Sequence, residues 1–121
     1  MDRFTQAYIE AMLWAETDGD APLVENYTAD DIVPEAMARI IDDCKAFQEE
    51  NATRLAAYPT GGIYSREELA GHDLWLTRNE HGVGFWDREY LPQWARDALT
   101  ESANRLGPVW VYVGDDGRLY L

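Results

Sequence analysis

The sequence predicts an α+β fold: two N-terminal helices, a β-hairpin, a third helix and a terminal β-hairpin. The four strands are expected to form one small antiparallel sheet that is packed by helices. Apolar residues recur at helical spacing in three long segments, whereas two other segments alternate around glycine-containing turns. A chain of 121 residues with 46% hydrophobic composition has the size and core of one domain. We therefore expect residues 1–121 to form a single acidic α+β domain.

The first helix is predicted from Asp2 to about Thr17, where apolar residues form the stripe of an amphipathic helix. The turn at 18–20, followed by Pro22, ends it. The segment as far as Tyr27 is expected to be an extended surface loop.

The second helix is predicted from about Pro34 to Ala57. Thr28-Ala29-Asp30-Asp31 has the capping-box form, and Pro34 suits the first turn of a helix. The segment 58–62, Tyr-Pro-Thr-Gly-Gly, stops it. The buried face is predicted to be Met37, Ile40, Ile41, Cys44, Phe47 and Leu55, and the opposite face is strongly acidic.

The centre of the chain predicts a short helix and then a hairpin. Ser65-Arg66-Glu67-Glu68 repeats the capping-box form and should begin one or two turns that end near Ala70. From His72 to Thr77 polar and apolar residues alternate with the period of a strand. A turn at 79–82 and a second short strand at 82–86 would complete this hairpin.

Helical spacing returns from Asp87 to Leu106 and stops at Gly107-Pro108. The segment Val109–Val113 is the strongest strand signal in the chain. Residues 114–117 predict a hairpin turn, and residues 118–121 return as the terminal strand.

The five tryptophans are spread over every predicted element. This distribution is typical of one aromatic-rich core; the alternative is that one or two are exposed in an interface. Trp75 should face the opposite side of the sheet from Leu74 and Leu76.

Charge is uneven along the chain. There are 23 acidic and ten basic residues, a net charge of −13. Residues 1–50 hold 13 acids and three bases, a net of −10, and residues 51–121 hold ten acids and seven bases, a net of −3. Such a field repels nucleic acid and acidic membranes and attracts basic protein surfaces. The competing interpretation is that the charge only keeps the protein soluble. The residues expected to bind a partner are Asp30, Asp31, Glu35, Asp42, Asp43, Glu49 and Glu50.

Targeting signals are not apparent in the sequence. No run approaches the about 18 apolar residues of a membrane span, and the N-terminus lacks the pattern of a signal peptide. The one cysteine, Cys44, has no partner for an internal disulfide and is expected to be a small buried hydrophobe. A cytoplasmic location is the simplest interpretation.

An alternative polar site lies in the predicted hairpin. There, His72 and Asp73 could meet His81, with Asn79 and Asp87 nearby. Such a cluster would bind a divalent metal or perform acid–base chemistry. No histidine pair at helical spacing and no Cys-x-x-Cys supports it, and the competing interpretation leaves both histidines structural or exposed. Nucleophile-elbow, phosphate-loop and calcium-loop patterns are also missing, so we expect no catalytic residue and no cofactor.

The segment GHDLWLTRNEHGVGFWDRE, from Gly71 to Glu89, resembles a GHDfWLTRNxHGxGFWDR segment in a family of small acidic bacteriophage and plasmid proteins of unassigned function. The N-terminal helix with its Leu-Trp-Ala-x-Thr-Asp, the Asp-Asp-Ile-Val-Pro-Glu start of the second helix, Asp43-Cys44-x-x-Phe47 and the terminal Tyr-Val-Gly-Asp-Asp-Gly also fit. The resemblance covers most of the chain. It implies a mobile-element source and no catalytic role. Glu80 departs from the family, in which a small residue such as glycine is expected.

Together these features favour an interaction protein over an enzyme. The expected function is a phage or plasmid product that binds and inhibits a host nucleic-acid-handling or defence complex, such as a restriction or CRISPR complex. It would do so through an acidic surface that could mimic nucleic acid. The partner is expected to be a basic host protein or nucleoprotein complex in the bacterial cytoplasm, with no direct binding of nucleic acid. A small enzyme centred on the 71–87 hairpin, an accessory phage protein without a defence role, and a homodimer are the open alternatives.

Overall fold

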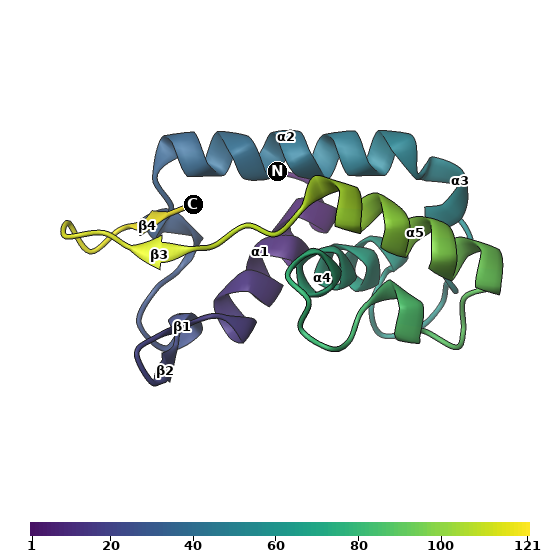
Figure 1. Cartoon of the computed structure of the whole chain (residues 1–121), viewed down its shortest axis with the longest axis horizontal. Coiled ribbons are helices and arrows are strands. Elements are labelled where there is room, and N and C mark those ends of the chain that lie inside the picture. The colour runs from purple at the N-terminus through teal and green to yellow at the C-terminus, as the bar shows by residue number, and fades with distance from the viewer.

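The computed structural model describes all 121 residues and is an α+β fold, as predicted (Figure 1). Five α-helices carry most of the chain, and the strands form two separate two-stranded antiparallel sheets. The helices are α1 (Arg3–Ala15), α2 (Pro34–Glu50), α3 (Ala52–Leu55), α4 (Arg66–Arg78) and α5 (Gln93–Leu106). The strands are β1 (Thr17–Asp18), β2 (Ala21–Pro22), β3 (Tyr112–Val113) and β4 (Leu119–Tyr120), and three short 3₁₀ helices are η1 (Leu23–Glu25), η2 (Ala29–Asp31) and η3 (Phe85–Asp87).

The predicted strand–turn–strand at 71–87 is wrong, because residues 66–78 form α4. The capping box is correct as the start: the Ser65 Oγ accepts from the Glu68 N–H at 3.1 Å, and the Glu68 carboxylate accepts from the Ser65 N–H at 3.3 Å. The helix continues through Gly71 to Arg78 and is buried over most of its circumference. The alternation between 72 and 77 therefore does not mark a strand. Glu80, which follows the helix, has a left-handed φ of 56°, the conformation that a glycine adopts with less strain.

The centre of the molecule is the crossing of α1 and α4, which contact each other more extensively than any other two elements. Asp2 begins α1 by accepting a hydrogen bond from the Thr5 N–H at 2.8 Å. Gly71 of α4 lies directly against the α1 backbone, and a Cβ at this position would come within 2.2 Å of the Phe4 carbonyl oxygen. Gly71 is thus a close-approach residue within a helix and does not end one.

The predicted long helix is divided into α2 and α3 at Asn51. The Asn51 side chain is fully buried and donates to the Phe47 carbonyl at 2.9 Å and to the Ser102 Oγ of α5 at 2.8 Å. Ile40, Cys44 and Phe47 are buried as predicted, together with Ala36, whereas Met37 and Leu55 are partly buried and Ile41 is exposed. The Thr28 capping box begins η2 instead of α2, which starts with Pro34 in its first turn. The third predicted helix starts later, at Gln93, because η3 and a turn occupy residues 85–92.

The predicted single four-stranded sheet is also wrong. Residues 17–22, expected to be the end of the first helix followed by a turn and loop, form the β1–β2 hairpin with Thr17 opposite Pro22. The C-terminal hairpin forms as predicted but is short, with Tyr112 opposite Tyr120. It joins the rest of the molecule where the Val33 N–H donates to the Leu119 carbonyl at 3.0 Å. Both hairpins lie at the end of the molecule that is opposite α3 (Figure 1).

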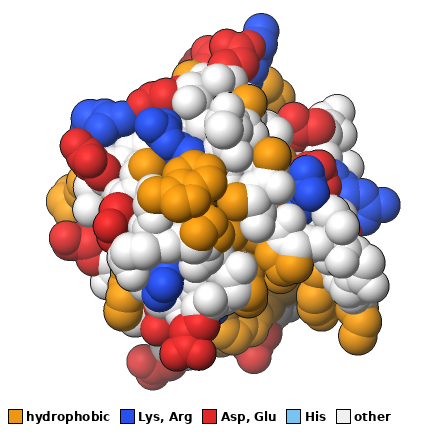
Figure 2. Space-filling view, turned by 90° about the vertical axis from the view of Figure 1, so that its right-hand side faces the viewer, with side chains coloured by type: hydrophobic (Ala, Val, Ile, Leu, Met, Phe, Trp, Pro, Cys, Tyr) orange, Lys and Arg blue, Asp and Glu red, His pale blue; other side chains and the backbone are white.

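The core is aromatic-rich as expected, but four of the five tryptophans do not contribute to it, which is more than the one or two exposed residues of the alternative. Trp75, predicted to face away from the core leucines, is fully buried, whereas Trp14 and Trp110 are 70% and 82% exposed and Trp86 and Trp94 are about half exposed. The core is one cluster of 25 buried residues, in which Phe4, Tyr8, Phe47, Tyr58 and Phe85 supply all of the remaining aromatic rings. At the end of the molecule viewed in Figure 2, hydrophobic side chains reach the surface among charged side chains of both signs.

None of the helices combines the length and the apolar character that crossing a membrane requires.

Candidate functional site

The seven carboxylates predicted to bind a partner lie on η2 and on α2. Glu35, Asp42 and Glu49 are exposed and recur every seven residues, so they form one stripe along α2 with a spacing of about 10 Å. Asp30 is exposed on η2, just before this stripe begins. These four carboxylates have no hydrogen bond or salt bridge to another side chain within the chain.

Asp43 differs from these four because it has an interior partner. Its Oδ2 accepts from the Arg78 Nη1 at 2.9 Å, and the Arg78 side chain is 1% exposed. Arg78 also donates to the Tyr8 hydroxyl at 3.1 Å and to the carbonyls of Gly107 at 2.8 Å and Leu106 at 3.3 Å. Burial alone would lower the pKa of Arg78, but contact with Tyr8 and Asp43 raises it above its ordinary value. Asp43 therefore ties α2 to α4 and presents little free charge to a partner.

Two more of the predicted carboxylates are also occupied. Glu50 pairs with Arg105 of α5 on the surface, and Asp31 accepts from the Thr28 N–H at 2.8 Å within its capping box. Both are accessible, although each already holds one partner. The seven predicted residues thus divide into four unpaired carboxylates, two that hold a surface or backbone partner, and the partly buried Asp43, whose partner is the buried Arg78.

A longer acidic stretch is defined by the positions at which Lys and Arg are missing. Between Arg3 and Arg39 the chain has no Lys or Arg. None of the carboxylates in this interval forms a salt bridge with Lys or Arg, whereas the arginine-paired carboxylates all lie at position 43 or later. We call residues 10–35 the acidic segment; its eight carboxylates are Glu10, Glu16, Asp18, Asp20, Glu25, Asp30, Asp31 and Glu35. It includes both strands of the β1–β2 hairpin, η1 and η2, and the absence of bases was a sequence signal that could have located it.

The two histidines of the alternative polar site are not brought together. The His72 Nε2 lies 3.5 Å from the Glu10 Oε2, with both side chains exposed. The His81 Nε2 lies 2.5 Å from the Glu16 Oε2, which also accepts from the Trp75 Nε1 at 2.8 Å. Each imidazole therefore contacts its own carboxylate on the α1 side. No group of three or more His, Cys, Asp or Glu side chains is placed to hold a metal ion.

The other members of that predicted site have separate roles. Asp73 is buried and accepts from the Tyr58 hydroxyl at 2.7 Å and from the Arg88 Nη2 at 2.6 Å. Burial, followed by the charge of Asp73, raises the pKa of Tyr58, and the hydrogen bond to Asp73 raises the pKa of Arg88. Asn79 ends α4 and accepts from the Val109 N–H at 2.9 Å, while Asp87 is exposed on η3. Asp73 anchors the chain that follows α4.

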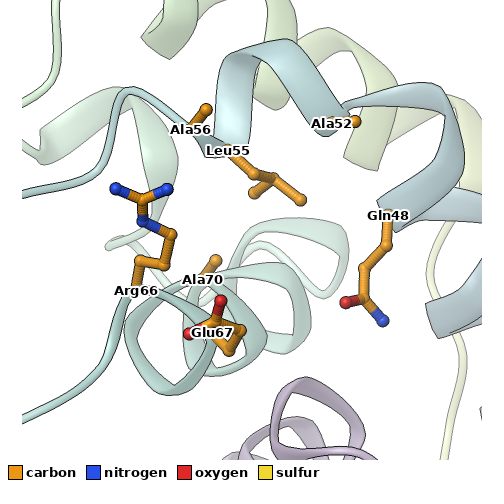
Figure 3. Close-up of a pocket in the computed structure, with 7 residues that line it drawn as sticks. All are labelled: Gln48, Ala52, Leu55, Ala56, Arg66, Glu67 and Ala70. Atoms are coloured by element: carbon orange, nitrogen blue, oxygen red, sulfur yellow. The ribbon is translucent and has the colours of Figure 1, made fainter. Parts of the chain in front are cut away.

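His72 and Asp73 do share a surface cleft of about 560 Å³ with Tyr64, Arg88 and Tyr90. Its one buried carboxylate is already matched by Arg88, so this cleft offers few uncommitted ionic groups. A smaller groove of about 240 Å³ lies between α3 and α4 (Figure 3). In that view the Leu55 side chain points into the gap, and Arg66 and Gln48 lie at its opposite sides.

The polar contacts that sequence inspection missed join residues far apart in the chain. Arg78 and Asp43 are 35 residues apart, and Trp75 and Glu16 are 59 apart. No local pattern marks such pairs. Comparison of the chain with protein-family models, with curated protein sequences and with solved structures found no match.

Proposed function

We propose that the protein is an interaction protein that binds a basic host protein or nucleoprotein complex through the acidic segment and the adjoining stripe of α2. Binding would block a nucleic-acid-handling or defence complex in the bacterial cytoplasm. The observation that supports this proposal is the run of eight carboxylates without any Lys or Arg, none of which forms a salt bridge with Lys or Arg; Glu10 and Glu16 contact only histidines. Carboxylates of this kind project a field that steers and orients a basic partner.

Mimicry of nucleic acid is the narrower form of the proposal. Double-stranded DNA carries one charge per about 1.7 Å of its axis, whereas Glu35, Asp42 and Glu49 are spaced by about 10 Å along α2. Arg39 and Lys45 are also exposed on α2. The helix stripe alone is thus much less densely charged than a duplex. The acidic segment has to supply the remaining charge, so we favour a general acidic docking surface.

The phage or plasmid origin rests on the resemblance of the segment around residues 71–89 and its companion motifs. An accessory phage protein with no defence role fits the same resemblance, and inhibition of a captured complex would distinguish the two. An enzyme centred on residues 71–87 is the weaker alternative, because its two imidazoles contact different carboxylates.

The test is an affinity pull-down from a nuclease-treated bacterial lysate, with mass spectrometry of the bound proteins at low and moderate salt. The acidic variant combines Asp30→Asn, Glu35→Gln, Asp42→Asn and Glu49→Gln. The control neutralises four exposed carboxylates elsewhere, with Asp87→Asn, Glu89→Gln, Asp97→Asn and Glu101→Gln. Both variants have the same net charge, so only the position of the neutralised groups differs.

We expect one basic complex to be recovered, to be lost from the acidic variant and to be retained by the control. The nucleic-acid-handling activity of the captured complex should fall when the unmodified protein is added. Equal losses from both variants would mean that net charge alone causes capture. An empty pull-down would argue against the interaction proposal.

A further inference from the structure

An apolar groove opens within the acidic part of the surface, between α1 and the turns η1 and η2. It has a volume of about 320 Å³. The buried side chains of Ile9 and Leu13 are part of its lining, and Val24, which is 53% exposed, forms part of its rim. The other apolar residues that line it are Met1, Tyr27 and Ala29. Aliphatic groups in this groove are accessible to a partner.

One carboxylate lines this groove, and two more follow its lining residues in the chain. Glu10 of α1 is one of its lining residues. Glu25 and Asp30 are exposed and directly follow the groove residues Val24 and Ala29. The nearest basic residues along the chain are Arg3 and Arg39, so no Lys or Arg occurs on η1, η2 or the intervening chain. The groove therefore combines an apolar floor with the Glu10 carboxylate and a lining without Lys or Arg.

An aromatic side chain stands close to the same groove. Trp14 is 70% exposed and follows Glu10 by four residues on α1, so the two side chains are neighbours on one helix face. Exposed tryptophan beside a groove is typical of the residues that contribute most to binding energy. The Trp14 indole is not part of the core, in which Trp75 is the one buried tryptophan.

We propose that this groove docks an amphipathic, lysine- or arginine-bearing segment of a partner protein. Its apolar side chains would lie on Ile9, Leu13 and Val24, and its cations would face Glu10, Glu25 and Asp30. Helix-in-groove recognition uses this combination of apolar anchors and flanking charge. A second copy of the chain fits poorly, because a net charge of −13 repels itself. The proposal rests on the interaction function above and adds the chemistry of the bound segment.

The test uses fluorescence anisotropy with two labelled synthetic peptides of about 15 residues, a length at which a helix becomes marginally stable. One peptide places leucines on one helical face and lysines on the other, and the second has the same composition in scrambled order. Each is titrated with the unmodified protein, with Val24→Ser, and with a control, Val83→Ser, in the loop after α4. Both valines are exposed, and unfolding curves check that all three proteins are folded.

We expect the amphipathic peptide to bind more tightly than the scrambled one, and Val24→Ser to weaken its binding about five-fold while Val83→Ser has no effect. Equal binding of both peptides, unchanged by Val24→Ser, would overturn the groove and leave charge-driven binding intact. If neither peptide binds but the pull-down recovers a complex that requires the acidic residues, the groove assignment is wrong and the interaction function stands. If both experiments are negative, the two proposals fail together.

Discussion

The surroundings of α4 and the acidic segment differ in whether their charged side chains have partners within the protein. Around α4, the buried Asp73 and Arg78 each contact at least one oppositely charged group and a tyrosine hydroxyl. In the acidic segment, eight carboxylates face no basic partner other than two histidines. Buried ions need partners because desolvation is costly, whereas solvated ions do not. The charges around α4 therefore stabilise the fold, whereas the carboxylates of the acidic segment remain free to bind a partner.

The largest effect that separates the two regions should come from Arg78. Arg78→Met leaves the Asp43 carboxylate, the Tyr8 hydroxyl and two carbonyls without their donor. Removing one member of a buried pair costs several kcal/mol, and we expect a loss of about 3 kcal/mol in the free energy of unfolding. Urea unfolding followed by circular dichroism measures this loss.

Arg39→Met is the matched control for Arg78→Met. The Arg39 Nε lies 4.0 Å from the same Asp43 oxygen, and its side chain is half exposed. Its removal should cost less than about 0.5 kcal/mol. If both variants lost a similar amount of unfolding free energy, the buried Arg78 would contribute no more to stability than the surface Arg39, which would contradict this prediction.

The next largest effect tests the helix crossing on which the interior pairs depend. Gly71→Ala places a methyl group within 2.2 Å of the Phe4 carbonyl oxygen, so α1 and α4 must move apart. We expect a loss of about 2 kcal/mol, measured by thermal or urea unfolding. If residues 71–77 formed a strand with free space at Gly71, the alanine variant would be tolerated, and an unchanged midpoint would support that structure.

Gly71 also shows why the fold could be predicted only in part. Signals that act locally gave correct results: the Ser65 cap, the Gly107 stop and the C-terminal hairpin turn lie where the sequence places them. The segment after Gly71 failed because α4 is buried on most sides, and a helix of this kind has no clear apolar face to detect. The predicted end near Ala70 is wrong because Gly71 continues α4 and allows the close approach of two helices.

The candidate site was predictable to a similar extent. Composition located the excess of acids in the first half of the chain, and Asp30, Glu35, Asp42 and Glu49 are exposed as that prediction requires. It could not separate them from Asp43, because the partner Arg78 is distant in sequence and its position follows from how α2 and α4 pack. The convergence of His72 and His81 depended on the hairpin and was lost with it.

A smaller effect is expected where the two regions meet, at Glu16. This residue belongs to the acidic segment, but its Oε2 accepts from the buried Trp75 indole and contacts His81. Glu16→Gln should cost about 1 kcal/mol, because an amide oxygen is a weaker acceptor than a carboxylate. It should also speed hydrogen exchange at the Trp75 indole N–H, which NMR detects.

Glu10→Gln is the control for Glu16→Gln, because its contact with His72 is 3.5 Å long and both side chains are exposed. It should leave stability within about 0.5 kcal/mol and the Trp75 indole unchanged. If Glu10→Gln destabilises the protein more than Glu16→Gln does, Glu16 is not the residue that links the acidic segment to the core.

A pH-dependent effect of less than about 1 kcal/mol is expected from Asp2, the N-cap of α1. Burial opposes the shift, but hydrogen bonds from Thr5 and Gln48 hold the pKa of Asp2 below its ordinary value of 3.8. A carboxylate with a lowered folded-state pKa contributes stability that is complete above pH 3.8 and is lost as pH falls through the folded pKa. Asp2→Asn keeps the cap, so it should remove this part of the acid dependence with little change at pH 7. Unfolding curves at neutral and acidic pH would test it, and an unchanged pH profile would contradict it.

The smallest change in stability is expected from the unpaired carboxylates themselves. Asp30→Asn and Glu35→Gln remove charges that have no side-chain partner, so stability should stay within about 0.5 kcal/mol. Reduced repulsion favours a gain, whereas Glu35→Gln also loses the favourable interaction of a carboxylate in the first turn of α2 with the helix dipole. Asp43→Asn, in contrast, should destabilise the protein because it weakens the tie to Arg78. Urea unfolding of the three variants shows which of these carboxylates stabilises the fold and which does not. A loss of stability at Asp30 or Glu35 as large as that at Asp43 would mean that the acidic segment is held by contacts of its own, and neutralising it in a binding experiment would then test folding as well as recognition.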